Sequence, residues 1–183
     1  VLDRPTSFGL GSRRVQGGEG GQEGLLPLAK MIIEGGGYKE ATELLHRFVE
    51  EYPEDNKAPL RAYRAAWLAL KARQFTKARR LFAEFRQVYP RHQRVLMARW
   101  FEAWTYFRQG WYRRALRDIR RWGRRRRSLR CGLKARYWTG RIYERQGKLS
   151  KALAVYRDIL RRSPLHLYAI WSRLRLQTLA FAM

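Results

Sequence analysis

Ten arginines fall within 18 residues in the second half of the chain, and their guanidinium groups are the densest cluster of ligand-binding groups in the sequence. Guanidinium groups bind carboxylates and phosphates through paired hydrogen bonds, so the cluster predicts a surface for an anionic partner. Trp111 and Trp138 lie close by in sequence and offer rings for stacking on sugars or bases. The arginines of this cluster are Arg113, Arg114, Arg117, Arg120, Arg121, Arg124, Arg125, Arg126, Arg127 and Arg130.

A structural origin explains the same arginines without any partner. The chain holds 32 Arg against 8 Lys, a skew that also follows from coding bias, and arginines commonly solvate the outer faces of helices. The first five arginines share much of one helix's outer surface, and the last five are expected in the loop that follows. Trp122 occupies a position typical of core packing. Both interpretations stay open on the sequence.

Charge is distributed unevenly along the 183 residues. Residues 1–57 carry 7 Lys/Arg and 10 Asp/Glu, whereas residues 58–183 carry 33 and 5. The net charge of +25 therefore arises in the second part of the chain. Such a field attracts anions and repels further copies of the same molecule. The candidate anions are nucleic acid, an acidic lipid surface and an anionic cell-wall polymer.

No residues are spaced for catalysis or for a resident metal. The carboxylates after position 57 are expected on helices beside basic neighbours, where ion pairing is more common than acid catalysis. Among them, Glu102 and Glu144 lie near aromatic residues and are the best candidates for a general acid. The histidines lack metal-ligand spacing, and the single cysteine, Cys131, allows neither an intramolecular disulfide nor a Cys-only metal site. We therefore expect no catalytic residue, cofactor or metal, and no enzyme activity from this chain by itself.

Residues 1–24 contain seven glycines and few apolar residues, which predicts a flexible leader. No apolar run approaches the roughly 18 residues that a bilayer span needs. No signal peptide is visible, and the start at Val1 is compatible with a removed leader or with an internal fragment.

From Leu25 onward the apolar spacing is helical, and strand patterns are absent. A short helix precedes the glycines at 35–37, and eight further helices are expected. In the third predicted helix, Leu60, Tyr63, Ala66, Trp67 and Leu70 are expected to lie inward. The eight are expected at about 38–52, 56–73, 75–89, 92–109, 111–122, 134–146, 149–163 and from 165 to the end.

A repeat of 37 residues organises these helices. Small residues mark the second helix of each pair at Ala41, Ala78, Ala115 and Ala152. A large residue follows each alanine by four positions, and proline follows three of them by twelve. Alanine allows two helices to approach closely, and proline ends a helix. The sequence therefore predicts an all-α solenoid of about four helical hairpins plus a terminal helix, over residues 25–183.

The spacing of glycine, an aromatic or leucine, alanine, a large residue and proline resembles the tetratricopeptide repeat. It occurs at Gly36, Tyr38, Ala41, Leu45 and Pro53, and again at Gly147, Leu149, Ala152, Tyr156 and Pro164. The tetratricopeptide period is about 34 residues, so a period of 37 places this chain in the wider class of similar α-solenoids. This resemblance implies an adaptor that grips an acidic peptide or protein.

Residues 134–176 also resemble the superhelical domain of soluble lytic transglycosylases. The resemblance is carried by Tyr137, Trp138, Gly140, Arg141, Gly147, Ala152, Tyr156, Pro164, Leu165, Tyr168, Ala169, Arg173 and Leu174. In these periplasmic enzymes the helical domain precedes a lysozyme-like domain that cleaves peptidoglycan. The catalytic Glu-Ser pair and the Gly-Leu-Met-Gln motif of that domain do not occur in this chain. The resemblance implies a non-catalytic scaffold whose catalytic domain is missing or lies outside this chain.

Three functions follow from these patterns. The main prediction is a helical scaffold in the periplasm or cell envelope that positions anionic peptidoglycan or a partner. The alternative is a tetratricopeptide-type protein–protein adaptor, and the cytoplasm is the alternative location. The third is binding of polyanions or nucleic acid through the arginine cluster.

The last helix also bears on the partners. Leu174, Leu176, Leu179, Ala180 and Phe181 form an apolar face with no following helix to cover it. We expect this face to pack on a further domain, a second subunit or a larger assembly.

Overall fold

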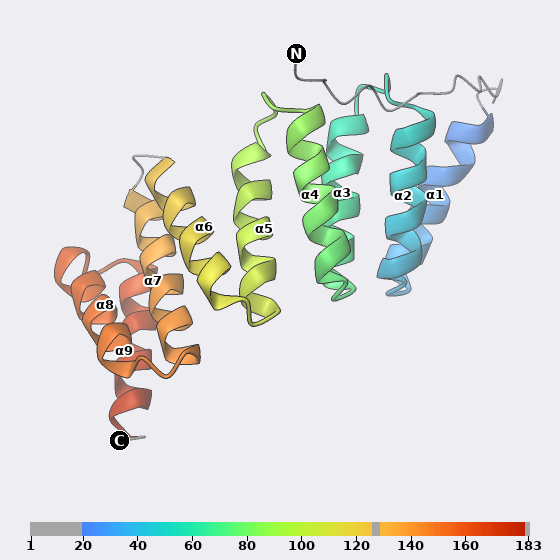
Figure 1. The fold of residues 1–183 in the computed structure, drawn as a ribbon. Helices are drawn as coiled ribbons and strands as arrows, with labels where there is room; N and C mark the ends of the chain where they lie inside the picture. The colour runs from blue at the N-terminus through green and yellow to red at the C-terminus, as the bar shows by residue number, and fades with distance from the viewer. Residues whose placement is uncertain (1–19, 126–128, 182–183) are drawn as a thin grey trace, which may run out of the picture.

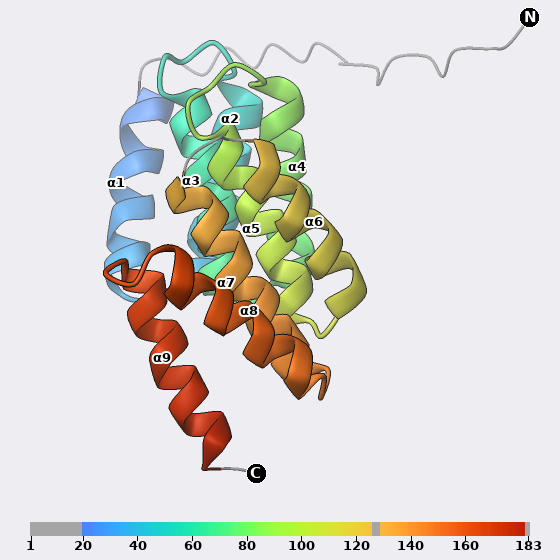
Figure 2. The ribbon, with the colours of Figure 1, turned by 90° about the vertical axis from the view of Figure 1, so that its left-hand side faces the viewer.

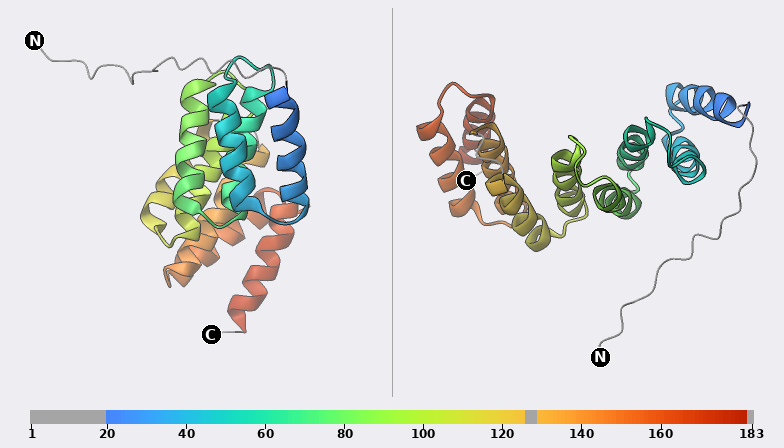
Figure 3. Two further views of the ribbon diagram at one scale, coloured as in Figure 1. Left: turned by 90° about the vertical axis from the view of Figure 1, so that its right-hand side faces the viewer. Right: turned by 90° about the horizontal axis from the view of Figure 1, so that it is seen from above.

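The computed structural model describes residues 20–125 and 129–181, and all regular structure in these residues is helical. The helices cross the molecule in chain order (Figure 1), each packed on the helices before and after it. Seen from above, α1, α3 and α5 lie along one side and α2, α4 and α6 along the other (Figure 3). The helices are α1 Gly20–Glu34, α2 Tyr38–Glu51, α3 Ala58–Lys71, α4 Phe75–Val88, α5 Val95–Arg108, α6 Tyr112–Arg125, α7 Leu129–Arg145, α8 Leu149–Arg162 and α9 Leu167–Ala180. The predicted all-α solenoid of four hairpins plus a terminal helix is confirmed.

The small residues of the repeat lie where paired helices meet, as the sequence predicts. The alanines of the repeat are fully buried, at Ala41, Ala78, Ala115 and Ala152. The large residues four positions after them are also buried and comprise Leu45, Phe82, Ile119 and Tyr156. Proline follows the end of α2, α4 and α8 by two residues, at Pro53, Pro90 and Pro164.

The turns inside the hairpins share one backbone conformation. Gly36, Gly110 and Gly147 have φ of 80°, 79° and 70°, in the left-handed region. The second hairpin carries Arg73 at the equivalent place, with φ of 60°. That conformation costs a residue with a side chain about 1–2 kcal/mol. The packing of α3 on α4 therefore holds this turn against the local preference of arginine.

The third hairpin differs from the prediction. α6 continues past Gly123 to Arg125, and α7 begins at Leu129, five residues before Lys134. Residues Arg124, Arg125 and Arg130, expected in a loop, are therefore helical. Arginine is a good helix former, which favours the longer helices. At position 123 only glycine fits, because a Cβ there would lie 2.4 Å from the Cβ of Ala135 on α7. Gly123 thus marks a close helix contact and not a helix end.

The N-terminal boundary also moves. α1 begins at Gly20, inside the segment 1–24 that we expected to be a flexible leader. Residues 1–19 lie outside the described part of the chain.

The terminal helix is only partly open. Leu176 and Leu179 pack with the core formed by α7 and α8, so the prediction was wrong for these two residues. Figure 2 shows α9 at the end of the array. The exposed apolar side chains of α9 and its C-cap are Leu167, Ile170, Trp171, Leu174 and Phe181.

The repeat explains which face of α9 stays open. Leu174 is 56% exposed, whereas Tyr137, 37 residues earlier, is 6% exposed. Tyr137 packs on Tyr156, which belongs to the second helix of its own hairpin. α9 has no such second helix among the described residues. Its cover by another domain, subunit or assembly stays a prediction.

Gly140 on α7 offers a test of the packing. A Cβ at this position would lie 2.5 Å from the ring of Tyr156, which is fully buried on α8. We expect Gly140→Ala to lower the free energy of unfolding by about 1–3 kcal/mol, because the ring has no room to move. Urea denaturation followed by circular dichroism at 222 nm measures this change.

Gly132 on the same helix is the matched control. A Cβ there meets no atom within 4 Å. Gly132→Ala should raise the free energy of unfolding by about 0.5–1 kcal/mol, because alanine loses less backbone entropy on folding. Equal effects of the two substitutions would contradict the packing described here.

Candidate functional site

A groove of about 920 Å³ lies between α1, α3 and α5. Its walls are mainly apolar, and the apolar side chains most open to solvent are Leu60, Trp67 and Met97, which are 43%, 37% and 36% exposed. The volume lies within the range of ligand-binding pockets, which are mostly apolar with a few polar groups. We call this cavity the α1–α3–α5 groove.

Sequence reasoning missed this groove because it assigned Leu60 and Trp67 to the core. Tyr63, Ala66 and Leu70 are buried as expected, but Leu60 and Trp67 face the groove. The sequence did contain a signal that Trp67 is partly exposed. Arg64 lies three residues before it and Lys71 four residues after it, on the same face of α3. A tryptophan flanked by cations on one helix face indicates a partly open surface.

Cations surround the apolar wall of the groove. Arg61 is 2.5 Å from Asp55 and lies over the ring of Phe48, and Arg94 lies 5.0 Å from the centre of the Tyr63 ring. The lining cations are Lys30, Lys57, Arg61, Arg64 and Arg94, and Glu34 is the one carboxylate among the lining residues described. The groove therefore has an apolar base and a positive rim.

The arginine cluster predicted from the sequence divides among three clefts. Arg113 and Arg114 line a cleft of about 480 Å³ beside Trp111. Arg121 lines a cleft of about 190 Å³ that also includes Arg86 and Glu102. Arg120 and Arg124 line a third cleft, of about 590 Å³, between α6, α7 and α8.

The other arginines of the cluster occupy different surroundings. Arg117 is 3.0 Å from its neighbour Asp118, and Arg130 is exposed in the first turn of α7. Arg125 ends α6, while Arg126 and Arg127 lie outside the described residues. The arginines that are close in sequence therefore do not form one continuous site. Their role in binding an anion stays a prediction.

The two tryptophans proposed for stacking are placed differently. Trp111 is 45% exposed and lies against Tyr106, with Arg79 and Arg114 over its ring. Trp138 is half-buried among the rings of Trp100, Trp104, Phe107 and Tyr137. Trp111 thus presents more of its ring to an external ligand.

Trp122 packs in the core, as predicted. It is buried, and its indole Nε1 donates a hydrogen bond to the carbonyl of Leu96 over 2.7 Å.

The carboxylates near aromatic residues are ion-pair partners. Glu144 is 8% exposed, accepts a hydrogen bond from the hydroxyl of Tyr156, and is 2.7 Å from Arg175. Burial and this hydrogen bond raise the pKa of the Tyr156 hydroxyl. Glu102 pairs with Arg86 of α4. These contacts give both carboxylates a structural role between helices.

Across residues 20–125 and 129–181, no group of three His, Cys, Asp or Glu is arranged to hold a metal ion. Over the same residues, no helix has both the length and the apolar character required to cross a bilayer.

Lys134 on α7 is held between two tryptophans. Its Nζ lies 3.9 Å from the ring centre of Trp100 and 5.5 Å from that of Trp122. Burial lowers the pKa of this ammonium group from 10.5 to about 8. The charge is therefore retained at neutral pH at a cost to the folded state.

Lys134→Met tests this electrostatic cost. Between pH 8 and 10.5 the unfolded chain binds more protons at Lys134 than the folded chain, so this residue makes stability rise with pH. We expect the wild type to gain about 1 kcal/mol relative to Lys134→Met between pH 7 and 9.5, after allowance for solvent screening. Urea denaturation at both pH values measures the difference. A pH-independent difference would show that burial does not perturb the group.

Comparison with known proteins adds to this geometry. Family models described as tetratricopeptide repeat match residues 62–92 and 102–166. No curated protein matches the chain.

Solved structures share the fold. A kinesin-light-chain-like protein of Podosopora anserina with nearly identical TPR-like repeats has 17% identity and a TM-score of 0.59, covering 82% of this chain and 81% of its own. MamA from Desulfovibrio magneticus RS-1, from position 41 to its end, has 16% identity and a TM-score of 0.55, covering 84% of each chain. An ArsTM double mutant of MamA RS-1 has 16% identity and a TM-score of 0.56, covering 76% and 74%. With the matched repeats and the nine described helices, these likenesses show that the chain is a tetratricopeptide-type α-solenoid.

Proposed function

We propose that this protein is an interaction adaptor that holds a segment of a partner protein in the α1–α3–α5 groove. The segment has apolar side chains for the base of the groove and carboxylates for its rim. The observation that carries the proposal is the combination of an apolar cavity of about 920 Å³ with five lining cations and one lining carboxylate. Tetratricopeptide repeats in this chain support a protein as the partner.

The shape of the groove suits a chain segment better than a small molecule. It extends over three successive hairpins, from Leu26 on α1 to Phe101 on α5. An apolar anchor would contact Leu60, Trp67 and Met97, which are already partly exposed to water. Covering such side chains releases water from apolar surface and gives roughly 25 cal/mol for each Å² buried. The cations at the rim would orient the segment and speed its association.

The envelope scaffold, our main prediction from the sequence, has less support than the adaptor. The matching family models describe tetratricopeptide repeats, and the kinesin-light-chain-like structure has TPR-like repeats; none of these matches points to lytic transglycosylases. The resemblance of residues 134–176 rests largely on packing residues such as Tyr137, Gly140 and Tyr156, all of them buried. Helical hairpins of many functions need such residues. Binding of peptidoglycan or nucleic acid gains no support from these comparisons either.

Selection from a displayed library of random 12-residue peptides tests the adaptor. We expect the protein to enrich peptides that combine an aromatic or aliphatic residue with Asp or Glu nearby. Trp67→Ala should lower the affinity for the selected peptides by about 10-fold or more, because it removes a central apolar contact of the groove. Fluorescence anisotropy with the labelled peptides measures the affinity.

Trp111→Ala is the matched control, since Trp111 is similarly exposed but lies outside the groove. Its affinity for the selected peptides should stay within about 2-fold of the wild type. A loss that is equal for the two variants would place the peptide elsewhere. Enrichment of basic peptides would contradict the proposed charge of the ligand.

A further inference from the structure

The cleft between α6, α7 and α8 has a different chemistry from the groove. Four arginines from these three helices line its volume of about 590 Å³, namely Arg120, Arg124, Arg136 and Arg162. Asp158 is the one carboxylate among the described residues that line it. We call this cavity the α6–α8 cleft.

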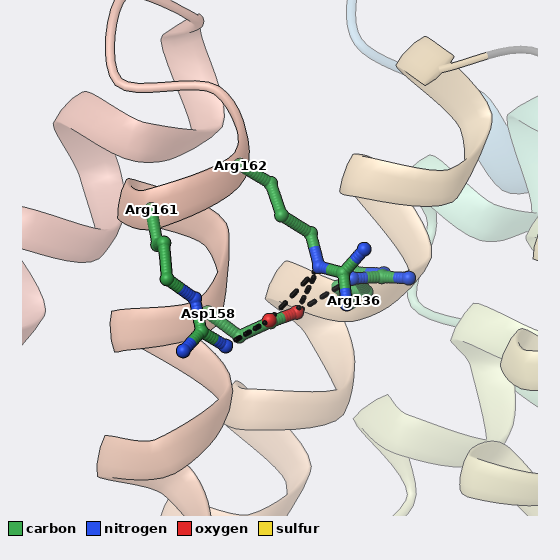
Figure 4. Close-up of polar contacts among 4 residues, drawn as sticks. All are labelled: Arg136, Asp158, Arg161 and Arg162. Atoms are coloured by element: carbon green, nitrogen blue, oxygen red, sulfur yellow. Dashed lines mark hydrogen bonds and ion pairs between the residues drawn. The ribbon is translucent and has the colours of Figure 1, made fainter.

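Asp158 organises one side of this cleft, as Figure 4 shows. Its carboxylate accepts hydrogen bonds from Arg136 of α7 over 2.5 Å and from Arg162 of α8 over 2.8 and 2.9 Å. Arg161 donates a further bond over 2.9 Å. Burial raises the pKa of Asp158, but the bonds from Arg162 and Arg161 outweigh it and hold the pKa below its usual value. The carboxylate therefore stays ionised and fixes two arginines of the cleft in place.

Arg120 and Arg124 lie on the α6 side of the cleft. Arg120 donates a hydrogen bond to the hydroxyl of Tyr143 over 2.6 Å, which orients its guanidinium group. Within residues 20–125 and 129–181, no carboxylate forms an ion pair with Arg120 or Arg124. Asp158 already serves several arginines at once. The cleft consequently holds a surplus of positive charge on partly fixed groups.

Small side chains keep the space between these arginines open. Gly123, Gly132, Ala135 and Ala154 line the cleft, together with Thr139. None of the described lining residues is aromatic. Single-stranded nucleic acid is generally held by bases stacked on aromatic rings, so this cleft lacks the usual platform for it. Its lining suits an anionic group on a short aliphatic stem.

Phosphate fits this arrangement better than carboxylate. A phosphate monoester carries close to two negative charges at neutral pH and three acceptor oxygens that point in different directions. A carboxylate has one charge and two oxygens in one plane. Guanidinium groups that enter from three helices can reach several phosphate oxygens together. The volume also exceeds that of a phosphate group, which leaves room for the residue that bears it.

We propose that the α6–α8 cleft binds a phosphorylated serine or threonine side chain of a partner protein. The arginines of α6 contact the phosphate oxygens, and the arginines held by Asp158 complete the site. This inference is independent of the α1–α3–α5 groove, because the two cavities share no lining residue. A tetratricopeptide-type array would then read a peptide segment and a phosphorylated residue on separate surfaces.

Fluorescence anisotropy with defined probes tests the inference. The probes are labelled pools of nine-residue peptides with mixed flanks and a central phosphoserine, the same pool with serine, and a mixed-sequence 12-nucleotide RNA. At about 0.15 M salt, surface charges are screened beyond about 8 Å, which suppresses non-specific attraction. We expect the full chain to bind the phosphoserine pool about 10-fold or more tightly than the serine pool.

Variants locate the binding. Arg120→Gln and Arg124→Gln should each lower the affinity for the phosphoserine pool by about 10-fold, because each removes a charge-assisted contact. Arg157→Gln removes the same charge from an exposed position of α8 outside the cleft and should change affinity by less than about 2-fold. Circular dichroism confirms that the exposed substitutions leave the fold intact.

Three results would overturn the inference. The first is equal binding, or no binding, of the phosphoserine and serine pools at concentrations up to about 1 mM. The second is an equal loss for Arg124→Gln and Arg157→Gln, which would indicate general charge attraction. The third is RNA binding that is tighter than binding of the phosphoserine pool and that Arg124→Gln weakens. This result would assign the cleft to nucleic acid. Trp67→Ala should leave phosphoserine binding unchanged, so this test and the groove test fail separately.

Discussion

The whole array depends on the close approach of two helices at one buried alanine in each hairpin. Ala41, Ala78, Ala115 and Ala152 are fully buried, and the residue four positions later fills the space beside each contact. Any larger side chain at the alanine would separate the helices and expose the core. Because the contact recurs every 37 residues, each hairpin adopts the same geometry and stacks on the next. The left-handed conformation of Arg73 shows that this packing outweighs a local preference of the backbone.

Ion pairs between helices use the few carboxylates of the basic part of the chain. Glu102 joins α5 to Arg86 of α4, Glu144 joins α7 to Arg175 of α9, and Asp158 joins α8 to Arg136 of α7. Each of these three carboxylates therefore links two helices. After residue 57 the chain holds 33 Lys/Arg against 5 Asp/Glu, so its excess of positive charge is set by composition.

The stacking of hairpins produces two cavities of different character. The α1–α3–α5 groove combines exposed apolar side chains with cations at its rim, which suits a segment of a protein. The α6–α8 cleft has small lining residues and several arginines, which suits a compact anion. The groove lies between helices of three successive hairpins, whereas the cleft lies between the consecutive helices α6, α7 and α8. The two proposed ligands would therefore bind at chemically distinct points of one molecule.

The sequence by itself determined the helical class, the 37-residue period, the buried alanines and most helix ends, because these depend on local spacing and on proline. It also identified the arginines that line the α6–α8 cleft on the α6 side. Only the tertiary structure decided that Gly123 is a helix contact, that Leu60 and Trp67 face a groove, and that Leu179 is buried. The same holds for the division of the arginine cluster and for the recruitment of Arg136 and Arg162. Helical periodicity indicates which residues share a face. Which neighbouring helix covers that face depends on how the hairpins are rotated relative to one another. This rotation is set by contacts between residues distant in the chain.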